Sequence, residues 1–138
     1  VSTADPFCKE LRNFAIKSAK SLKLKVHNKA TYVCIEGPRF STRAESRFFK
    51  DYVKADIIGM TVVPECVLAR EAEICYLSIA TITDYDVWAD KPVSTKEVLE
   101  TIQKNVKNTR KLLSELISKI PLQRKRCECG KALENAKL

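Results

Sequence analysis

Two carboxylates follow an apolar run near the middle of the sequence. In "SIATITDYDVW", Ser78 to Trp88, β-branched residues end in Asp84 and Asp86, two residues apart. Two acids held close together keep one of them protonated, because adjacent negative charges repel. A protonated carboxyl can act as a general acid, and an ionised one accepts hydrogen bonds from N–H donors. Asp at a strand end also commonly forms a turn, and that alternative stays open.

Two other apolar runs end in residues that could contact a ligand. "TYVCIEG" is followed by Phe40 and Ser41, and "ADIIGMT" ends in Met60 and Thr61. In open α/β sheets, ligands bind beyond the carboxyl ends of the strands. If the three runs are parallel strands, they bring an aromatic face, hydroxyls and carboxylates to one rim. Such a rim suits a flat heterocycle that carries N–H donors, of which adenine is an example.

Several of these residues also have a purely structural explanation. Phe40 could pack into the core ahead of a helix, Met60 could be a core residue, and Thr61 could cap a helix. His27 is the only histidine and lies among basic residues, so we interpret it as a surface residue. Without a second histidine, Ser–His or Cys–His nucleophile chemistry is not expected. The sequence also contains no Walker loop and no G-x-G-x-x-G motif.

Helices alternate with the three apolar runs. Asp5-Pro6 predicts a helix start, and Thr42 to Glu45 and Ser94 to Glu97 are capping boxes. The predicted helices run from Asp5-Pro6 to Leu22, from Thr42 to Val53, from Pro64 to Glu73 and from Ser94 to Pro121, and the predicted strands are Thr31 to Gly37, Ala55 to Thr61 and Cys75 to Thr83. Strict alternation predicts an α/β fold with a largely parallel central sheet.

Length and charge limit the classes of protein to consider. A chain of 138 residues suits one domain, here with a C-x-C tail from Pro121 to Leu138. A net charge of +8 fits a lysine-rich surface, an anionic substrate or a nucleic acid. The alternative to an enzyme is therefore a basic nucleic-acid-binding module using Arg124 to Arg126. Aromatic residues interleaved with basic ones would support it, and they are missing, so no nucleic-acid partner is expected.

Targeting signals are also missing from the sequence. No apolar stretch approaches the roughly 20 residues of a membrane span, and no signal peptide is visible. We therefore expect no membrane partner and a cytoplasmic location. The sequence begins "VSTADPF" without methionine, which points to a fragment or a processed product.

Six cysteines are many for a chain of this length. Cys127 and Cys129 form a C-x-C, and the other four are widely separated: Cys8, Cys34, Cys66 and Cys75. Zinc sites usually contain paired C-x₂₋₄-C motifs, so no metal is expected and the single cysteines are interpreted as packing residues. Scattered thiols are typical of intracellular proteins, except in hyperthermophiles, where disulfides are common. The many Lys, Arg and Glu with only three Gly lean towards a thermophile.

At these residues the sequence resembles one family. "TYVCIEGPRFSTRAES", "ADIIGMTVVPECVLAREAEICY" and "ATITDYDVW" resemble the trimeric purine nucleoside phosphorylase family, in its branch that acts on methylthioadenosine. The resemblance runs from Val1 through the long helix and covers the C-terminal half of the family's chain. It implies a three-layer α/β fold with a central, mostly parallel or mixed sheet flanked by helices. The terminal "RCECGKAL" is similar to the tail of archaeal, disulfide-bearing members.

The resemblance also implies a reaction. The family cleaves the N-glycosidic bond with phosphate as co-substrate, giving a free purine and a ribose 1-phosphate without metal or organic cofactor. For this chain it implies a pentosyltransferase for 5′-methylthioadenosine, and possibly for adenosine and other purine nucleosides, in purine and methionine salvage. Members form homotrimers or hexamers. Their N-terminal half carries further phosphate-binding segments, so this chain alone is expected to be inactive without that half.

Site roles follow from the same resemblance. Phe40 is implied to stack on the base or ribose, Ser41 to shape the base site, Met60 to pack on the ribose and Thr61 to bind phosphate. The pocket for the apolar 5′ substituent is implied at Thr95, Val98 and Leu99.

Two acids are implied to act on the base. Asp84 faces N7 and the 6-amino group, and Asp86 supports the same edge. Enzymes selective for 6-oxopurines place Asn at the position of Asp84, so a carboxylate here favours adenine nucleosides.

Disulfides are implied as well. The resemblance favours pairing of Cys8 with Cys75, and Cys127 with Cys129 is a possible, strained C-x-C bridge. Pairing of Cys66 into the tail is a competing option.

Overall fold

The structure is a computed structural model that describes residues 1–85, 95–134 and 136. The chain divides into two compact units, each built from stretches that are far apart in the sequence. The first unit comprises Val1–Val26, Thr61–Ile79 and Lys111–Leu138, and the second comprises His27–Met60 and Ala80–Arg110. Each unit is described by itself.

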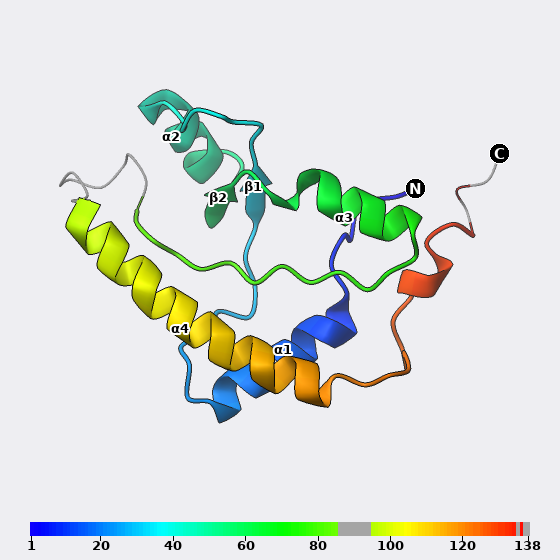
Figure 1. The fold of residues 1–138 in the computed structure, drawn as a ribbon. Helices are drawn as coiled ribbons and strands as arrows, with labels where there is room; N and C mark the ends of the chain where they lie inside the picture. The colour runs from blue at the N-terminus through cyan, green and yellow to red at the C-terminus, as the bar shows by residue number, and fades with distance from the viewer. Residues whose placement is uncertain (86–94, 135, 137–138) are drawn as a thin grey trace. The chain divides into compact units, whose positions relative to one another are not determined.

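The core of the first unit lies between two helices, α1 (Lys9–Ser21) and the last turns of α4 (Thr95–Lys119) (Figure 1). Ala15 and Ala19 of α1 pack against Leu112 and Leu116 of α4. Small residues facing large ones allow the two helices to approach closely, and every buried CH₂ adds about 0.8 kcal/mol of hydrophobic stabilisation. Further partly buried side chains surround this core: Phe14, Leu22, Leu24, Leu77 and Ile79.

Helix α1 begins later than the sequence predicts. The N-cap is Cys8, whose thiol accepts a hydrogen bond from the Leu11 N–H at 3.4 Å, so the prediction of a start at Asp5-Pro6 is wrong. The backbone N–H of Cys8 donates to the Tyr76 carbonyl at 2.8 Å. The Phe7 ring stacks on that of Tyr76 with centroids 6.0 Å apart. These contacts hold Phe7 and Cys8 against Tyr76, and Cys8 itself has extended backbone angles, so the helix begins only at Lys9.

The second unit contains a parallel pair of strands, β1 (Tyr32–Cys34) and β2 (Ile57–Gly59). Val33 lies opposite Ile58, and the Ile35 N–H extends the ladder to the Gly59 carbonyl at 2.9 Å. Before the strands begin, the Asp56 carboxylate accepts from the Thr31 N–H at 2.6 Å. The predicted parallel pairing of the first two apolar runs is confirmed, although each strand is shorter than predicted.

Two helices follow these strands. Helix α2 (Arg43–Asp51) has the predicted capping box, because Thr42 and Glu45 exchange both of its hydrogen bonds. Helix α3 (Val62–Glu71) belongs to the first unit and has non-helical backbone angles at Val63, so it starts slightly before the predicted Pro64.

The predicted third strand is wrong for this chain. Residues 75–83 have no strand assignment. A strand is defined by hydrogen bonds to a neighbouring strand, and this segment instead bonds to non-strand groups. Tyr76 accepts from the Cys8 N–H, and the Asn105 side chain donates to the Ile82 carbonyl at 2.9 Å.

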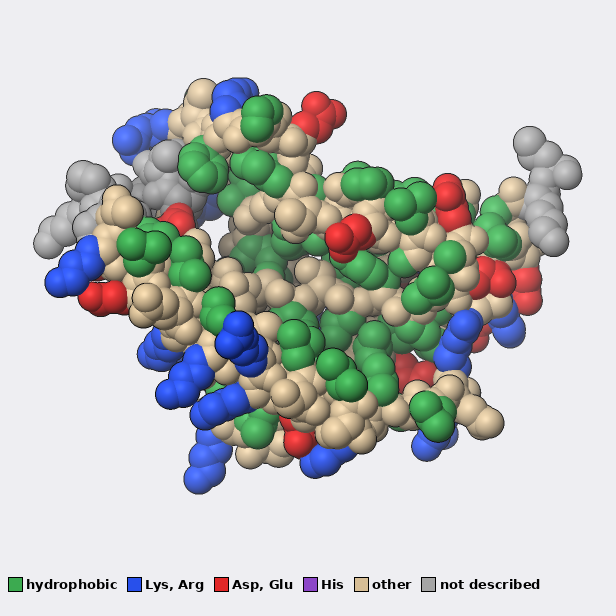
Figure 2. All heavy atoms as spheres, in the orientation of Figure 1, with side chains coloured by type: hydrophobic (Ala, Val, Ile, Leu, Met, Phe, Trp, Pro, Cys, Tyr) green, Lys and Arg blue, Asp and Glu red, His purple; other side chains and the backbone are tan. Residues whose placement is uncertain are grey.

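The end of the chain and its surface complete the description. The tail contains a 3-10 turn, η2 (Cys129–Lys131), and the predicted capping residue Ser94 lies outside the described residues. Within the described residues, no helix is long and apolar enough to cross a bilayer. Figure 2 shows hydrophobic side chains at the surface. On α4 the exposed ones are Leu99, Ile102, Val106, Leu113 and Ile117.

Candidate functional site

The carboxyl ends of β1 and β2 meet through Gly37 and Met60. The Met60 sulfur lies 2.8 Å from the position that a Cβ on Gly37 would occupy. Gly37 has a φ of +70°, which residues with a side chain rarely adopt. Two properties therefore require glycine at this position: the positive φ, and the position of the Met60 sulfur, which leaves no room for a Cβ. Within the second unit, this contact brings together the chain segments that end the first two apolar runs.

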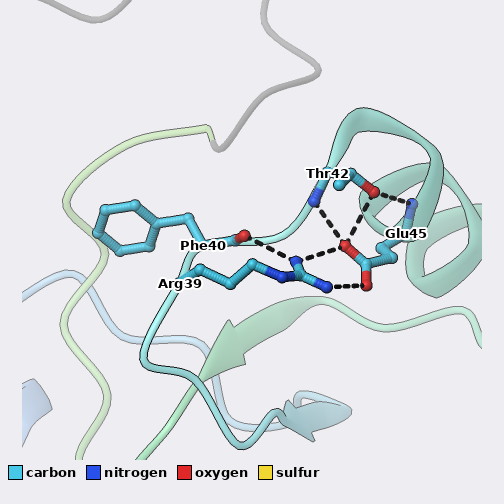
Figure 3. A network of polar contacts seen from close by, with 4 residues as sticks. All are labelled: Arg39, Phe40, Thr42 and Glu45. Atoms are coloured by element: carbon cyan, nitrogen blue, oxygen red, sulfur yellow. Dashed lines mark hydrogen bonds and ion pairs between the residues drawn. The ribbon is translucent and has the colours of Figure 1, made fainter.

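A polar network shapes the loop that follows Gly37 (Figure 3). The Arg39 guanidinium makes two hydrogen bonds to the Glu45 carboxylate, at 2.8 and 2.7 Å, and donates to the Phe40 carbonyl at 3.0 Å. Glu45 also accepts from the Thr42 backbone N–H at 2.7 Å. The loop carrying Phe40 and Ser41 is thereby tied at both ends to the first turn of α2.

The charges in this network stabilise each other. Hydrogen bonds from Arg39, followed by those from Thr42, hold the pKa of the Glu45 carboxyl far below its ordinary value. The same carboxylate raises the pKa of Arg39. Both groups are solvent-exposed, so the network fixes geometry more than it adds stability.

Phe40 projects away from the network. Its side chain points to the opposite side of the loop from the Arg39–Glu45 pair, and the residue is 84% exposed (Figure 3). The alternative that Phe40 packs into the core is therefore wrong for this chain. Ser41 beside it is buried, and Met60 is half-buried. The exposed aromatic face of Phe40 is a surface on which a flat ring can stack.

Asp84 lies in the same unit on the extended segment after Ile82. The Asp84 carboxylate accepts a hydrogen bond from the Thr83 hydroxyl at 2.7 Å. Two residues earlier, the Ile82 carbonyl accepts a hydrogen bond from the Asn105 side chain of α4. The predicted pocket residues on the first turns of α4 differ in exposure: Thr95 and Leu99 are exposed and Val98 is half-buried. Asp86 lies outside the described residues.

Thr61 lies in the first unit, at the start of α3. It occupies the N-cap position but makes no side-chain capping hydrogen bond, and it is exposed. The alternative that its hydroxyl caps the helix is therefore not supported, and the hydroxyl remains accessible to a ligand.

Comparison with known proteins identifies the family. A family model described as the Phosphorylase superfamily matches residues 1–118. The chain belongs to the Phosphorylase superfamily. It is 62% identical over 136 residues to S-methyl-5′-thioadenosine phosphorylase of Nitrosopumilus maritimus (strain SCM1), covering 99% of this chain and 51% of that protein. It is 58% identical over 134 residues to the protein of that name from Pyrococcus furiosus (strain ATCC 43587 / DSM 3638 / JCM 8422 / Vc1), covering 97% and 51%.

Solved structures show the superfamily fold. A methylthioadenosine phosphorylase from an antarctic soil metagenomic library has a TM-score of 0.86 at 39% identity, covering 96% of this chain and 47% of that one. An adenosine/methylthioadenosine phosphorylase variant from Schistosoma mansoni in complex with methylthioadenosine has a TM-score of 0.79 at 34% identity, covering 98% and 51%. The α/β fold class is thus confirmed. The chain spans about half the length of the curated relatives it matches.

Four cysteines of this superfamily member converge in the first unit, which their sequence spacing did not reveal. The sulfurs of Cys8, Cys75, Cys127 and Cys129 all lie within 4.8 Å of one another, and those of Cys75 and Cys127 are 3.5 Å apart. All four are free thiols, so the predicted disulfides are not confirmed. Cys66 is buried in α3 outside this group.

The thiols in this cluster perturb one another. Burial is the largest effect on Cys75 and raises its pKa far above the ordinary value; burial also raises the pKa of Cys129 to about 11. Burial opposes ionisation of Cys8 too, but hydrogen bonds from the Leu11 N–H and the neighbouring thiols outweigh it and lower that pKa.

Proposed function

We propose that this chain supplies the base and ribose site of a phosphorylase that converts 5′-methylthioadenosine and phosphate to adenine and 5-methylthioribose 1-phosphate. The observation that carries the proposal is the meeting of the two strand ends at Gly37 and Met60, with exposed Phe40 on the following loop. High identity to relatives named for this activity supports the choice of substrate. Adenosine and other purine nucleosides are secondary substrates of the same site.

The proposed reaction transfers the sugar from nitrogen to phosphate. As the N-glycosidic bond breaks, its electron pair goes to the purine, and a phosphate oxygen forms the new bond to C1′ of the ribose. Asp84 shares a proton with N7 and so offsets the negative charge that develops on the departing base. Its other oxygen accepts from the 6-amino group. Asp86 supports the same edge of the base.

The remaining residues position the nucleoside. Phe40 stacks on the base or ribose, Met60 packs on the ribose, and buried Ser41 limits the width of the base site. The 5′-methylthio group contacts Thr95, Val98 and Leu99 at the start of α4. Apolar side chains suit this group because burying its surface is favourable.

Phosphate needs more than this chain. The Thr61 hydroxyl donates a hydrogen bond to phosphate. We assign the other phosphate-binding groups to the part of the curated relatives that this chain does not cover. This chain alone is then inactive. The complete protein acts in the cytoplasm as a homotrimer or hexamer in purine and methionine salvage, and it requires neither metal nor organic cofactor for the reaction.

The direct test is adenine release by the complete protein. We expect release from methylthioadenosine that depends on phosphate, forms equal amounts of sugar 1-phosphate and survives a chelator. The matched control omits phosphate. Salt-sensitive RNA binding without adenine release would instead support a nucleic-acid-binding module.

A further inference from the structure

The Phe40 side chain has little packing of its own. It is 84% exposed, whereas the next residue, Ser41, is only 8% exposed. Because few contacts fix the ring directly, the region it can reach depends on where the backbone of Phe40 stands. The groups that hold this backbone therefore decide where the aromatic face is presented.

Two hydrogen bonds hold the backbone on either side of Ser41 (Figure 3). The Arg39 guanidinium donates to the Phe40 carbonyl at 3.0 Å. The Thr42 N–H donates to the Glu45 carboxylate at 2.7 Å. Arg39 and Glu45 are themselves joined by two hydrogen bonds, at 2.8 and 2.7 Å. The backbone groups before and after Ser41 are thus attached to one ion pair.

This ion pair is anchored to helix α2. The Thr42 hydroxyl donates to the Glu45 carboxylate at 2.8 Å and accepts from the Glu45 N–H at 3.2 Å. These bonds fix the carboxylate at the first turn of the helix. The Arg39 fork then meets both oxygens of a carboxylate that is already in place, and planar arginine matches this arrangement better than the compact ammonium of lysine.

We propose that Arg39 is a positioning residue for the nucleoside: together with Glu45, it holds the backbone of Phe40 so that the exposed ring is ready to stack on the base or ribose. The inference rests on the proposed function, in which Phe40 contacts the nucleoside. The Arg39–Glu45 pair lies on the opposite side of the loop from the ring (Figure 3). Arg39 therefore acts on the nucleoside through Phe40 and not by direct contact.

Such a role has a distinct kinetic signature. A loop that is already held in its binding conformation gives tighter binding, because less of its freedom is lost when the ligand arrives. The stacking contact is present both before and during bond cleavage, so its loss raises KM and leaves kcat nearly unchanged. Stacking does not depend on the 5′ substituent of the ribose. Methylthioadenosine and adenosine should therefore be affected alike.

The test compares Arg39→Met with the unchanged complete protein. We expect KM for methylthioadenosine and for adenosine to rise by the same factor, roughly three- to tenfold, with kcat nearly unchanged. The Kd of methylthioadenosine measured without phosphate should rise by that factor too. Arg47→Met, which changes an exposed arginine on the same helix, is the matched control and should leave both constants unchanged.

A second substitution shows whether Arg39 acts through the ring. Phe40→Leu alone should raise KM, and adding Arg39→Met to it should raise KM no further, because the ring to be positioned is gone. A further rise of the same factor in the double variant would overturn the inference. So would a fall in kcat at unchanged KM.

Folding and function are separated by two further measurements. The Arg39 side chain is 64% exposed, so its replacement leaves no cavity, and Arg39→Lys serves if Arg39→Met fails to fold. Its ammonium lacks the planar fork, so KM should also rise, and a normal KM would overturn the inference. Absence of adenine release by the unchanged protein would refute the proposed function itself. Adenine release with equal KM in Arg39→Met would refute only the role of Arg39.

Discussion

The sulfur of Met60 lies beside Gly37. It is only 2.8 Å from the position that the Cβ of any other residue would take there, which is closer than the two atoms can approach. One side chain from the end of β2 thereby fixes the backbone at the end of β1. This relationship sets where the loop of Phe40 and Ser41 leaves the sheet, and with it the proposed base site.

Substituting Gly37 should therefore be costly. In Gly37→Ala the left-handed backbone angle alone costs about 1–2 kcal/mol, and the new Cβ must also displace the Met60 thioether. We expect this loss in the free energy of unfolding of the complete protein, measured by chemical denaturation. Gly130→Ala is the matched control, since the added Cβ there meets only the flexible end of Arg124. Equal stability of the two variants would contradict this account.

Asp84→Asn tests base recognition. The amide cannot donate a proton to N7 as a carboxylic acid does, so kcat/KM for methylthioadenosine should fall by roughly 10²–10⁴. The amide N–H₂ can donate to a 6-oxo group, so the ratio of inosine to methylthioadenosine cleavage should rise. The measurement is release of hypoxanthine and adenine, with Asp51→Asn, an exposed acid at the end of α2, as control. An unchanged substrate ratio would argue against the assigned role.

Leu99→Ala tests the proposed 5′ pocket. The side chain is 54% exposed in this chain and is proposed to contact the methylthio group. Removing it should reduce kcat/KM for methylthioadenosine roughly tenfold relative to adenosine, because an apolar contact of this size is worth about 1–3 kcal/mol. Leu113→Ala removes a comparable exposed side chain further along α4 and should leave that ratio unchanged. A parallel loss for both substrates would place Leu99 outside the pocket.

The Arg39–Glu45 network predicts a pH dependence. The pKa of Glu45 is lower in the folded chain than in the unfolded one, so its contribution to stability is present above the unfolded value. That contribution should fall as the pH drops below about 4.3 towards the lower, folded pKa. Unfolding of Glu45→Gln, which keeps a capping side chain without the charge, should therefore differ from the unchanged protein at pH 7 and converge with it in acid.

The control for this pH profile is Glu71→Gln, which removes an exposed acid in α3. A difference between Glu45→Gln and the unchanged protein that persists undiminished at low pH would show that the charge is not responsible.

Local features were the most predictable from sequence. The capping box of Thr42 and Glu45 was found because both partners lie within four residues and their chemistry is self-contained. Parallel pairing of β1 with β2 followed from the alternation of helices with apolar runs. These patterns depend little on distant parts of the chain.

Features that depend on distant partners were less predictable. Residues 75–83 have strand-forming composition, but a strand also needs a neighbour, which composition does not specify. Helix α1 starts at Lys9 because Cys8 is bonded to Tyr76, which no local pattern contains. The four cysteines likewise converge only through tertiary structure, so their wide spacing gave no indication that their sulfurs lie close together.

The hydrogen bond between the Asp56 carboxylate and the Thr31 N–H lies before both strands, at the end of the sheet away from Phe40 and Met60. This hydrogen bond supports the alignment of the strands through residues that take no part in the proposed chemistry. A lineage can therefore exchange exposed Phe40 at the other end, and acquire a different nucleoside preference, while this hydrogen bond is kept. Met60 is the exception, because it takes part both in the contact at Gly37 and in the proposed ribose site.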